Sequence, residues 1–159
     1  MKKNLFKSQK GFTLIELLVV IVIIVVLAAV VFVALNPSKR LKDAKDARRT
    51  TDIATILTAI HLAIVDSKGT LPSGLSTSMP ETQLGTAGSG CAISTGGCAA
   101  TPSACIDLST SLNKYLKSVP ADPNGSAATT NYTVAVDANN IVTVRACGAE
   151  GGTNILQSR

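Results

Sequence analysis

The chain is poor in the side chains that most catalytic sites and base-stacking surfaces use. Its 159 residues include no tryptophan, a single histidine and only 3% aromatic residues. One histidine gives little material for the common zinc sites, and few aromatics leave little surface on which nucleic-acid bases could stack. No set of nucleophile, base and orienting acid can be assembled from positions alone. We therefore predict neither an enzyme nor a cofactor-binding protein, and no metal centre.

Charge is absent from one long stretch. Leu17–Leu35 is a run of 19 residues with no charged or strongly polar side chain. As an α-helix this run would be about 29 Å long, which is close to the hydrocarbon thickness of a bilayer. Its many Val and Ile residues would also suit a buried strand, but strands rarely exceed about ten residues. The sequence therefore predicts a membrane-spanning helix over residues 12–35.

Outside residues 1–11, the chain also has almost no excess of positive or negative charge. The formal net charge is +5, and four of the 15 basic residues fall within residues 1–11. The remainder carries 11 basic and 10 acidic side chains, a net charge of +1. The basic start predicts a cytoplasmic N-terminus. The charge of the whole chain is therefore mostly a topology signal and no indication of nucleic-acid binding.

The segment beyond the apolar run, Lys39–Arg49, is basic as well, with six Lys or Arg and two Asp. Charge counting alone therefore does not settle the orientation in the membrane. This segment could contact DNA or lipid headgroups. The ordinary interpretation is a solvated helix face on which charges pair at i,i+4 spacing, namely Lys39 with Asp43, Lys42 with Asp46 and Arg48 with Asp52.

The residues around the start of the apolar run form a compact motif. They read Lys10-Gly11-Phe12-Thr13-Leu14-Ile15-Glu16-Leu17. A secretory signal carries a small-residue cleavage site after its apolar core, but here the core is followed by Asn36-Pro37-Ser38-Lys39-Arg40. The one clean junction is the Gly11–Phe12 bond, before the core. Glu16 places a carboxylate at the rim of the apolar segment, where its insertion into lipid costs free energy and calls for a partner.

This motif resembles the prepilin leader of type IV pilins and type II secretion pseudopilins. The resemblance implies that a membrane peptidase removes residues 1–11 by cutting after Gly11, and that the new amino group of Phe12 is then methylated. It also implies that Glu16 steers subunit assembly. The alternative is a signal anchor that happens to contain a glutamate.

The resemblance further implies partners and locations. The partners would be the prepilin peptidase and methylase, other copies of the chain in a homopolymeric filament, an assembly ATPase and membrane platform proteins. The precursor would lie in the cytoplasmic membrane with its N-terminus in the cytoplasm. The assembled filament would lie at the cell surface.

The pattern after the apolar run predicts an α+β, pilin-like fold. Asn36-Pro37 predicts a kink or break in a long N-terminal helical spine. An amphipathic helix is expected over residues 36–68, because apolar residues recur at helical spacing from Ile53 and Gly69 is a natural stop. This helix would pack on a small C-terminal head formed by residues 69–159.

The head itself is predicted to combine a long loop, a short helix and a hairpin. Residues 69–104 are rich in Gly, Ser and Thr and are expected to be loop. Ile106–Leu116 is expected to be a short helix, because its leucines share one face. Alternation predicts an antiparallel hairpin of Tyr132–Val136 and Ile141–Arg145. The tail from Gly148 has little to pack except Ile155 and Leu156.

Two groups of residues in the head are candidates for covalent or metal chemistry. The chain's four cysteines are expected to form two disulfides if the head is exported. Of the three possible pairings we favour Cys91 with Cys98 and Cys105 with Cys147. Asp122 and Asn124, in the turn-rich segment 120–125, could offer oxygen ligands to calcium, as the loop does in some pseudopilins, although forming the turn is the more ordinary role.

The sequence thus favours a structural subunit of a type IV pilus-like filament. One alternative is a pseudopilin of a type II secretion or DNA-uptake system. An alternative of another class is a monomeric, membrane-anchored binding module. Nucleic acid remains a possible partner that the sequence does not support.

Overall fold

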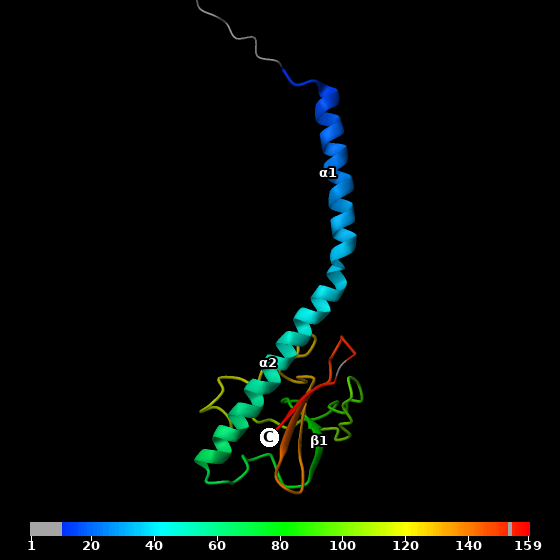
Figure 1. Cartoon of the computed structure of the whole chain (residues 1–159). Coiled ribbons are helices and arrows are strands. Elements are labelled where there is room, and N and C mark those ends of the chain that lie inside the picture. Colours follow the sequence, from blue (N-terminus) through cyan, green and yellow to red (C-terminus); the bar gives the residue numbers. More distant parts are fainter. Residues whose placement is uncertain (1–10, 153) are drawn as a thin grey trace, which may run out of the picture. The chain divides into compact units, whose positions relative to one another are not determined.

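The computed structural model describes residues 11–152 and 154–159. They form an α+β protein with a long apolar helix, a second helix and a four-stranded antiparallel sheet (Figure 1). The chain divides into two compact units, residues 1–40 and residues 41–159, and each is described by itself. The α+β class predicted from the sequence is confirmed. The predicted leader, except Gly11, lies outside the described residues.

The first unit contains α1, Leu14–Leu35, a helix of 22 residues. None of these residues is buried, and the mean hydropathy of its most apolar window is 3.7. Within the described part of the chain, α1 is the one helix long and apolar enough to cross a membrane. The predicted helical state of the apolar run is confirmed.

The junction after α1 is set by Asn36 and Pro37. Asn36 adopts a left-handed conformation, with φ of 41°, and its N–H donates to the Val33 carbonyl at 3.4 Å. The Asn36 side-chain oxygen then accepts the N–H of Lys39 at 3.3 Å. Pro37 follows as the first residue of α2, Pro37–Asp66, where the missing amide hydrogen costs nothing. The predicted break therefore falls at Asn36.

The second half of α2 supplies one wall of the core of the head. Its buried residues begin at Arg49 and continue along one face as Ile53, Ile56, Leu57, Ala59, Ile60 and Ala63. The helix is closed by Gly69, whose φ of 94° suits a residue without a side chain and whose N–H donates to the Ile64 carbonyl at 2.8 Å. The apolar stripe predicted from Ile53 onward is the packed face.

The sheet supplies the opposite wall. It consists of β1, Met79–Gln83; β2, Tyr132–Val136; β3, Val142–Ala146; and β4, Ile155–Ser158, in the order β1-β2-β3-β4. Val134 pairs with Val144, and both are fully buried. The turn between β2 and β3 is held by Asp137, whose carboxylate accepts the N–H groups of Asn139 and Ile141. The predicted hairpin is confirmed.

Two expectations for the head are wrong, the helix at 106–116 and the loop at 69–104, and the strand in the tail goes beyond what the sequence predicts. Ile106–Leu116 forms a series of turns instead of a helix, because Asp107 accepts the N–H of Ser109 and commits the backbone to a local turn. The segment 69–104 contains strand β1, and the tail contains strand β4. Both missed strands are short edge strands, and β1 contains Pro80 and an irregular register, so alternation could not reveal it.

The pairing of the cysteines is also corrected. Two disulfides are present, Cys91–Cys105 and Cys98–Cys147, instead of Cys91–Cys98 and Cys105–Cys147. The first closes the loop that precedes the turns at 106–116. The second joins that loop to the residue after β3, 49 positions away. Proximity in sequence therefore misled the expectation, since Cys98 pairs with the residue that follows the inner strand β3.

Candidate functional site

The residues of the N-terminal motif lie at the start of α1. Thr13 is the N-cap, and its hydroxyl oxygen accepts the N–H of Glu16 at 3.3 Å. In return, the Glu16 carboxylate accepts both the N–H and the hydroxyl of Thr13, each at 2.8 Å. This reciprocal capping box satisfies two donors at the start of the helix. Glu16 therefore has a local partner within the single chain, and the Thr13-x-x-Glu16 spacing before an apolar run is the sequence signal that identifies it.

Gly11 and Phe12 are open to their surroundings. Phe12 is 87% exposed. A Cβ built on Gly11 would have no atom of the described chain within 4 Å, and its backbone is outside the left-handed region. The chain's own packing therefore gives no reason for glycine at this position.

The apolar surface of α1 has no cover among the residues that the structure describes. Its large side chains are between about half and four-fifths exposed, from 48% at Val20 to 82% at Leu14. Beside Glu16 an open depression of about 430 Å³ is lined by apolar side chains of the same helix. Such a surface is stable only against lipid or against another apolar surface.

These features coincide with a known family pattern. Residues 6–32 match the family described as "Prokaryotic N-terminal methylation motif". This segment is the prepilin signature of type IV pilins and pseudopilins. A prepilin signature implies processing by a prepilin peptidase and assembly at a membrane, and the exposed α1 is consistent with membrane anchoring of the precursor. No curated protein and no solved structure matches the chain.

A second cluster lies in the head, around the buried Arg49. Its guanidinium is 0% exposed and donates to the buried carboxylate of Asp122 through Nε and, at 3.0 Å, through Nη2. Nη1 also donates to Asp46 at 2.8 Å. The hydrogen bonds to Asp122 raise the pKa of Arg49 further above its ordinary value. The cluster joins α2 to the turn that precedes β2.

The cluster extends to the loop after β3. The Asp46 carboxylate accepts the backbone N–H groups of Glu150 and Gly151, at 3.1 and 2.7 Å. Burial opposes the charge of Asp46, but these hydrogen bonds and that from Arg49 hold its pKa below the ordinary value. Lys45 donates to Glu150 at 3.1 Å, and this bond is the largest cause of the lowered pKa of Glu150. Three segments distant in sequence are thus held by one network.

The oxygens proposed for calcium belong to this cluster. Asp122 and Asn124 lie close together, since the Asp122 carboxylate accepts the N–H of Asn124 at 2.8 Å. Arg49 holds Asp122, and Lys45 lies 3.3 Å from the Asn124 side-chain oxygen. Two protein cations therefore occupy the space that a metal ion would need, and the donor set does not fit calcium.

Sequence reasoning missed Arg49 as the centre of the head. The available signal was its position, four residues before Ile53 and on the same helical stripe as the buried residues of α2. A charged residue on an apolar stripe requires a buried partner of opposite charge. The partner could not be identified, because Asp122 lies 73 residues away.

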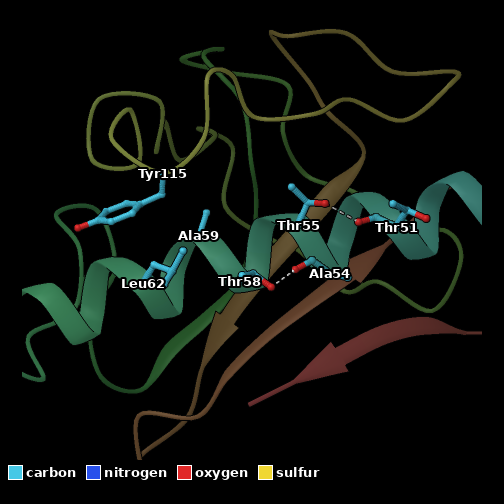
Figure 2. Close-up of a pocket in the computed structure, with 7 residues that line it drawn as sticks. All are labelled: Thr51, Ala54, Thr55, Thr58, Ala59, Leu62 and Tyr115. Carbon is cyan, nitrogen blue, oxygen red and sulfur yellow. Dashed lines mark hydrogen bonds between the residues drawn. The ribbon is translucent and has the colours of Figure 1, made fainter.

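The exposed side of α2 carries a groove of about 300 Å³ (Figure 2). It is lined by small and apolar side chains together with one tyrosine: Thr51, Ala54, Thr55, Thr58, Ala59, Leu62 and Tyr115. The hydroxyls of Thr55 and Thr58 donate to the carbonyls of Thr51 and Ala54, at 2.8 and 2.7 Å, and Figure 2 shows these bonds along the helix. The groove lining contains no carboxylate, imidazole or thiol, and its one titratable side chain is that of Tyr115, whose hydroxyl donates to the Asp66 carboxylate at 2.6 Å.

Proposed function

We propose that this chain is a structural subunit of a type IV pilus-like surface filament. A prepilin peptidase would cut between Gly11 and Phe12, and the new amino group of Phe12 would be methylated. An assembly ATPase and membrane platform proteins would then move the subunit from the membrane into a homopolymer. The observation that carries this proposal is a prepilin signature on a helix whose apolar surface has no cover within its own chain.

The exposure at the cleavage site supports the processing step. A peptidase must reach the backbone between Gly11 and Phe12, and Phe12 is 87% exposed. Apart from its chain neighbours, no atom of the described chain lies within 4 Å of a Cβ built on Gly11, so the requirement for glycine would come from the peptidase. A side chain at this position would crowd the approach of the enzyme to the bond.

The apolar surface of α1 supports the assembly step. In the precursor this surface would be covered by lipid. A subunit that leaves the bilayer must cover it with another apolar surface, and the α1 helices of other copies offer the same surface. Packing α1 helices together would bury the side chains from Leu14 to Leu35 in the filament core, and the heads would form the outer shell.

Glu16 would set the axial register of this packing. Cleavage gives Phe12 a positive amino group, and a methylated secondary amine keeps that charge. Two unit charges 4 Å apart attract by about 4 kcal/mol at an effective dielectric of about 20. The amine of one copy could thus replace Thr13 as the partner of Glu16 in a neighbour. A slipped copy would leave both charges unpaired in an apolar bundle.

A pseudopilin of a secretion or DNA-uptake system would use the same first steps. Within the filament machinery it is the second candidate, and the prepilin signature suits both equally. If genes for a peptidase, an assembly ATPase and a platform protein lie beside the gene for this chain, a pilin or a pseudopilin is favoured over a monomeric anchored module. Electron microscopy of surface filaments with peptide identification would separate an abundant pilus subunit from a minor or periplasmic one.

The processing step is tested by Gly11→Leu. A Cβ at position 11 meets no atom of the described chain beyond its neighbours, so that α1, the head and both disulfides are expected to remain intact while cleavage after residue 11 stops. Immunoblotting of membranes would then show only the uncut chain, and microscopy no filaments. Ser38→Leu, an exposed change outside the signature, is the matched control. Normal cleavage of the Gly11 variant would contradict the proposed recognition.

A further inference from the structure

The basic segment after α1 divides into a paired part and an unpaired part. Lys45, Arg48 and Arg49 each form ion pairs within the head. By contrast, no ion pair joins Lys39, Arg40, Lys42 or Asp43 to any residue that the structure describes, and the i,i+4 pairs expected for Lys39 and Lys42 do not form. The first part of the segment therefore carries three positive charges and one negative charge, a net charge of +2, and none of these charges is paired within the described chain.

The same part of α2 is not used by the packing of the head. Residues 37–44 are all exposed, and the buried residues of the helix begin only at Arg49. Leu41, between the basic residues, is 61% exposed. The segment thus presents one exposed leucine among three basic side chains, a combination that a bilayer interface accommodates.

The length of the chain limits how far these residues can lie from the end of α1. Lys39, Arg40 and Lys42 follow Leu35 by four, five and seven residues. Even a fully extended chain keeps Lys39 within about 14 Å of Leu35. Within α2, Lys42 lies only about 4.5 Å farther along the helix axis than Lys39. The polar headgroup layer extends roughly 5–7 Å beyond the hydrocarbon, and long basic side chains reach toward such a layer.

We propose that Lys39, Arg40 and Lys42 bind the anionic phospholipid headgroups of the membrane leaflet that α1 reaches at Leu35, with Leu41 entering the interface. The bound segment would hold the start of α2 at the bilayer surface in the precursor. This inference rests on the membrane anchoring of α1 and not on filament formation. Anionic lipid is favoured over DNA because α1 tethers the segment at the bilayer surface, and no aromatic side chain lies within residues 36–49 to stack on bases.

The test uses the full chain in vesicles and a spin label at Ala44→Cys. Ala44 is exposed, and the four native cysteines are held in disulfides, so that the label has one site. The readout is the accessibility of the label to oxygen relative to a polar relaxation agent. Vesicles of phosphatidylcholine alone are compared with vesicles that also contain phosphatidylglycerol.

We expect phosphatidylglycerol to shift the label toward the bilayer, and high salt to reverse the shift. The variant K39Q/R40Q/K42Q is expected to lose the shift. The matched control K68Q/K117Q/R159Q removes the same charge from exposed residues of the head that form no ion pair in the described chain, and it is expected to keep the shift.

Three results would overturn the proposal. The first is a label position that does not depend on phosphatidylglycerol. The second is an equal loss of the shift in both charge variants, which would show that only net charge matters. The third is binding of duplex DNA to the chain in phosphatidylcholine vesicles, measured by fluorescence anisotropy. This result counts against the proposal if the K39Q/R40Q/K42Q variant loses the binding and the label does not move when phosphatidylglycerol is added. Because the vesicles contain no peptidase or ATPase, none of these results depends on filament assembly.

Discussion

In α1, no residue is buried by the described chain, whereas α2 from Arg49 onward buries seven residues within the head. The head also has two disulfides and a buried arginine held by carboxylates. The difference separates two sources of stability. The head obtains its core, cross-links and ion pairs from within one chain, and α1 requires lipid or other copies to cover it. Changes in α1 should therefore alter assembly, and changes in the head should alter folding.

The largest effect is expected from Glu16→Ala. The helix should still insert, because alanine is the best helix former and the apolar segment loses its one charge. Cleavage after Gly11 should continue while filament yield falls to a small fraction of normal. Filament yield and cleavage should be measured together by microscopy and immunoblotting.

Glu16→Gln is the matched control, since glutamine can keep the capping box with Thr13 but carries no charge. Loss of filaments in both variants would assign the effect to the charge. Normal filaments from the glutamine variant would assign Glu16 to capping its own helix, and the register proposal would fail.

Arg49→Met tests the head at its centre. The substitution leaves the buried Asp122 carboxylate without its cation, and the expected loss is about 3–5 kcal/mol of unfolding free energy. Arg48→Met is the matched control, because Arg48 is 60% exposed in a surface pair and should cost only about 0.3–0.5 kcal/mol. Denaturant unfolding of the full chain in detergent measures both. Equal losses would mean that burial of the ion pair has little energetic effect.

The two disulfides are expected to differ in the free energy they contribute. Cys98–Cys147 closes a span of 49 residues and Cys91–Cys105 a span of 14. Loop-closure entropy gives about 4 kcal/mol for the first and about 3 kcal/mol for the second. Unfolding of the double-alanine variants of each pair would measure the difference. A larger loss from the shorter span would show that strain or residual structure outweighs loop entropy.

The smallest effect concerns pH and Asp46. Its pKa is lowered in the folded chain, so its contribution to stability is complete above the unfolded pKa near 4 and is lost as the pH falls through the folded value. Stability should fall between about pH 5 and about pH 3 more steeply for the native chain than for Asp46→Asn. Thermal unfolding across this pH range measures both chains. If the native chain and the Asp46→Asn variant lose stability equally as the pH falls, Asp46 is not the source of the pH dependence.

The same contrast explains what could be predicted from the sequence. The helix α1 follows from the length of its apolar run, and the stripe of α2 and the β2–β3 hairpin follow from local periodicity, so all three could be predicted. Strands β1 and β4 depend on neighbours in the sheet, and their short sequences carry no period of their own. The turns at 106–116 have helical apolar spacing, yet Asp107 and Ser109 favour a local turn.

The candidate sites divide in the same way. The motif at Gly11, Phe12 and Glu16 is contiguous and could be identified from sequence, and the Thr13-x-x-Glu16 spacing also carries the signature of the capping box that the structure contains. The Arg49 cluster and the cysteine pairing join residues between 14 and 105 positions apart. Such contacts are decided by the packing of the whole head and not by any local pattern.

The central claim is that α1 begins at a processed terminus and is covered by other copies in a filament. Intact-mass analysis of the chain recovered from purified surface filaments tests it most directly. The account predicts a chain that starts at Phe12, carries one added methyl group and holds two disulfides. A filament subunit that still retains Lys10 and Gly11 would contradict it. Purified surface filaments that do not contain this chain would contradict it as well.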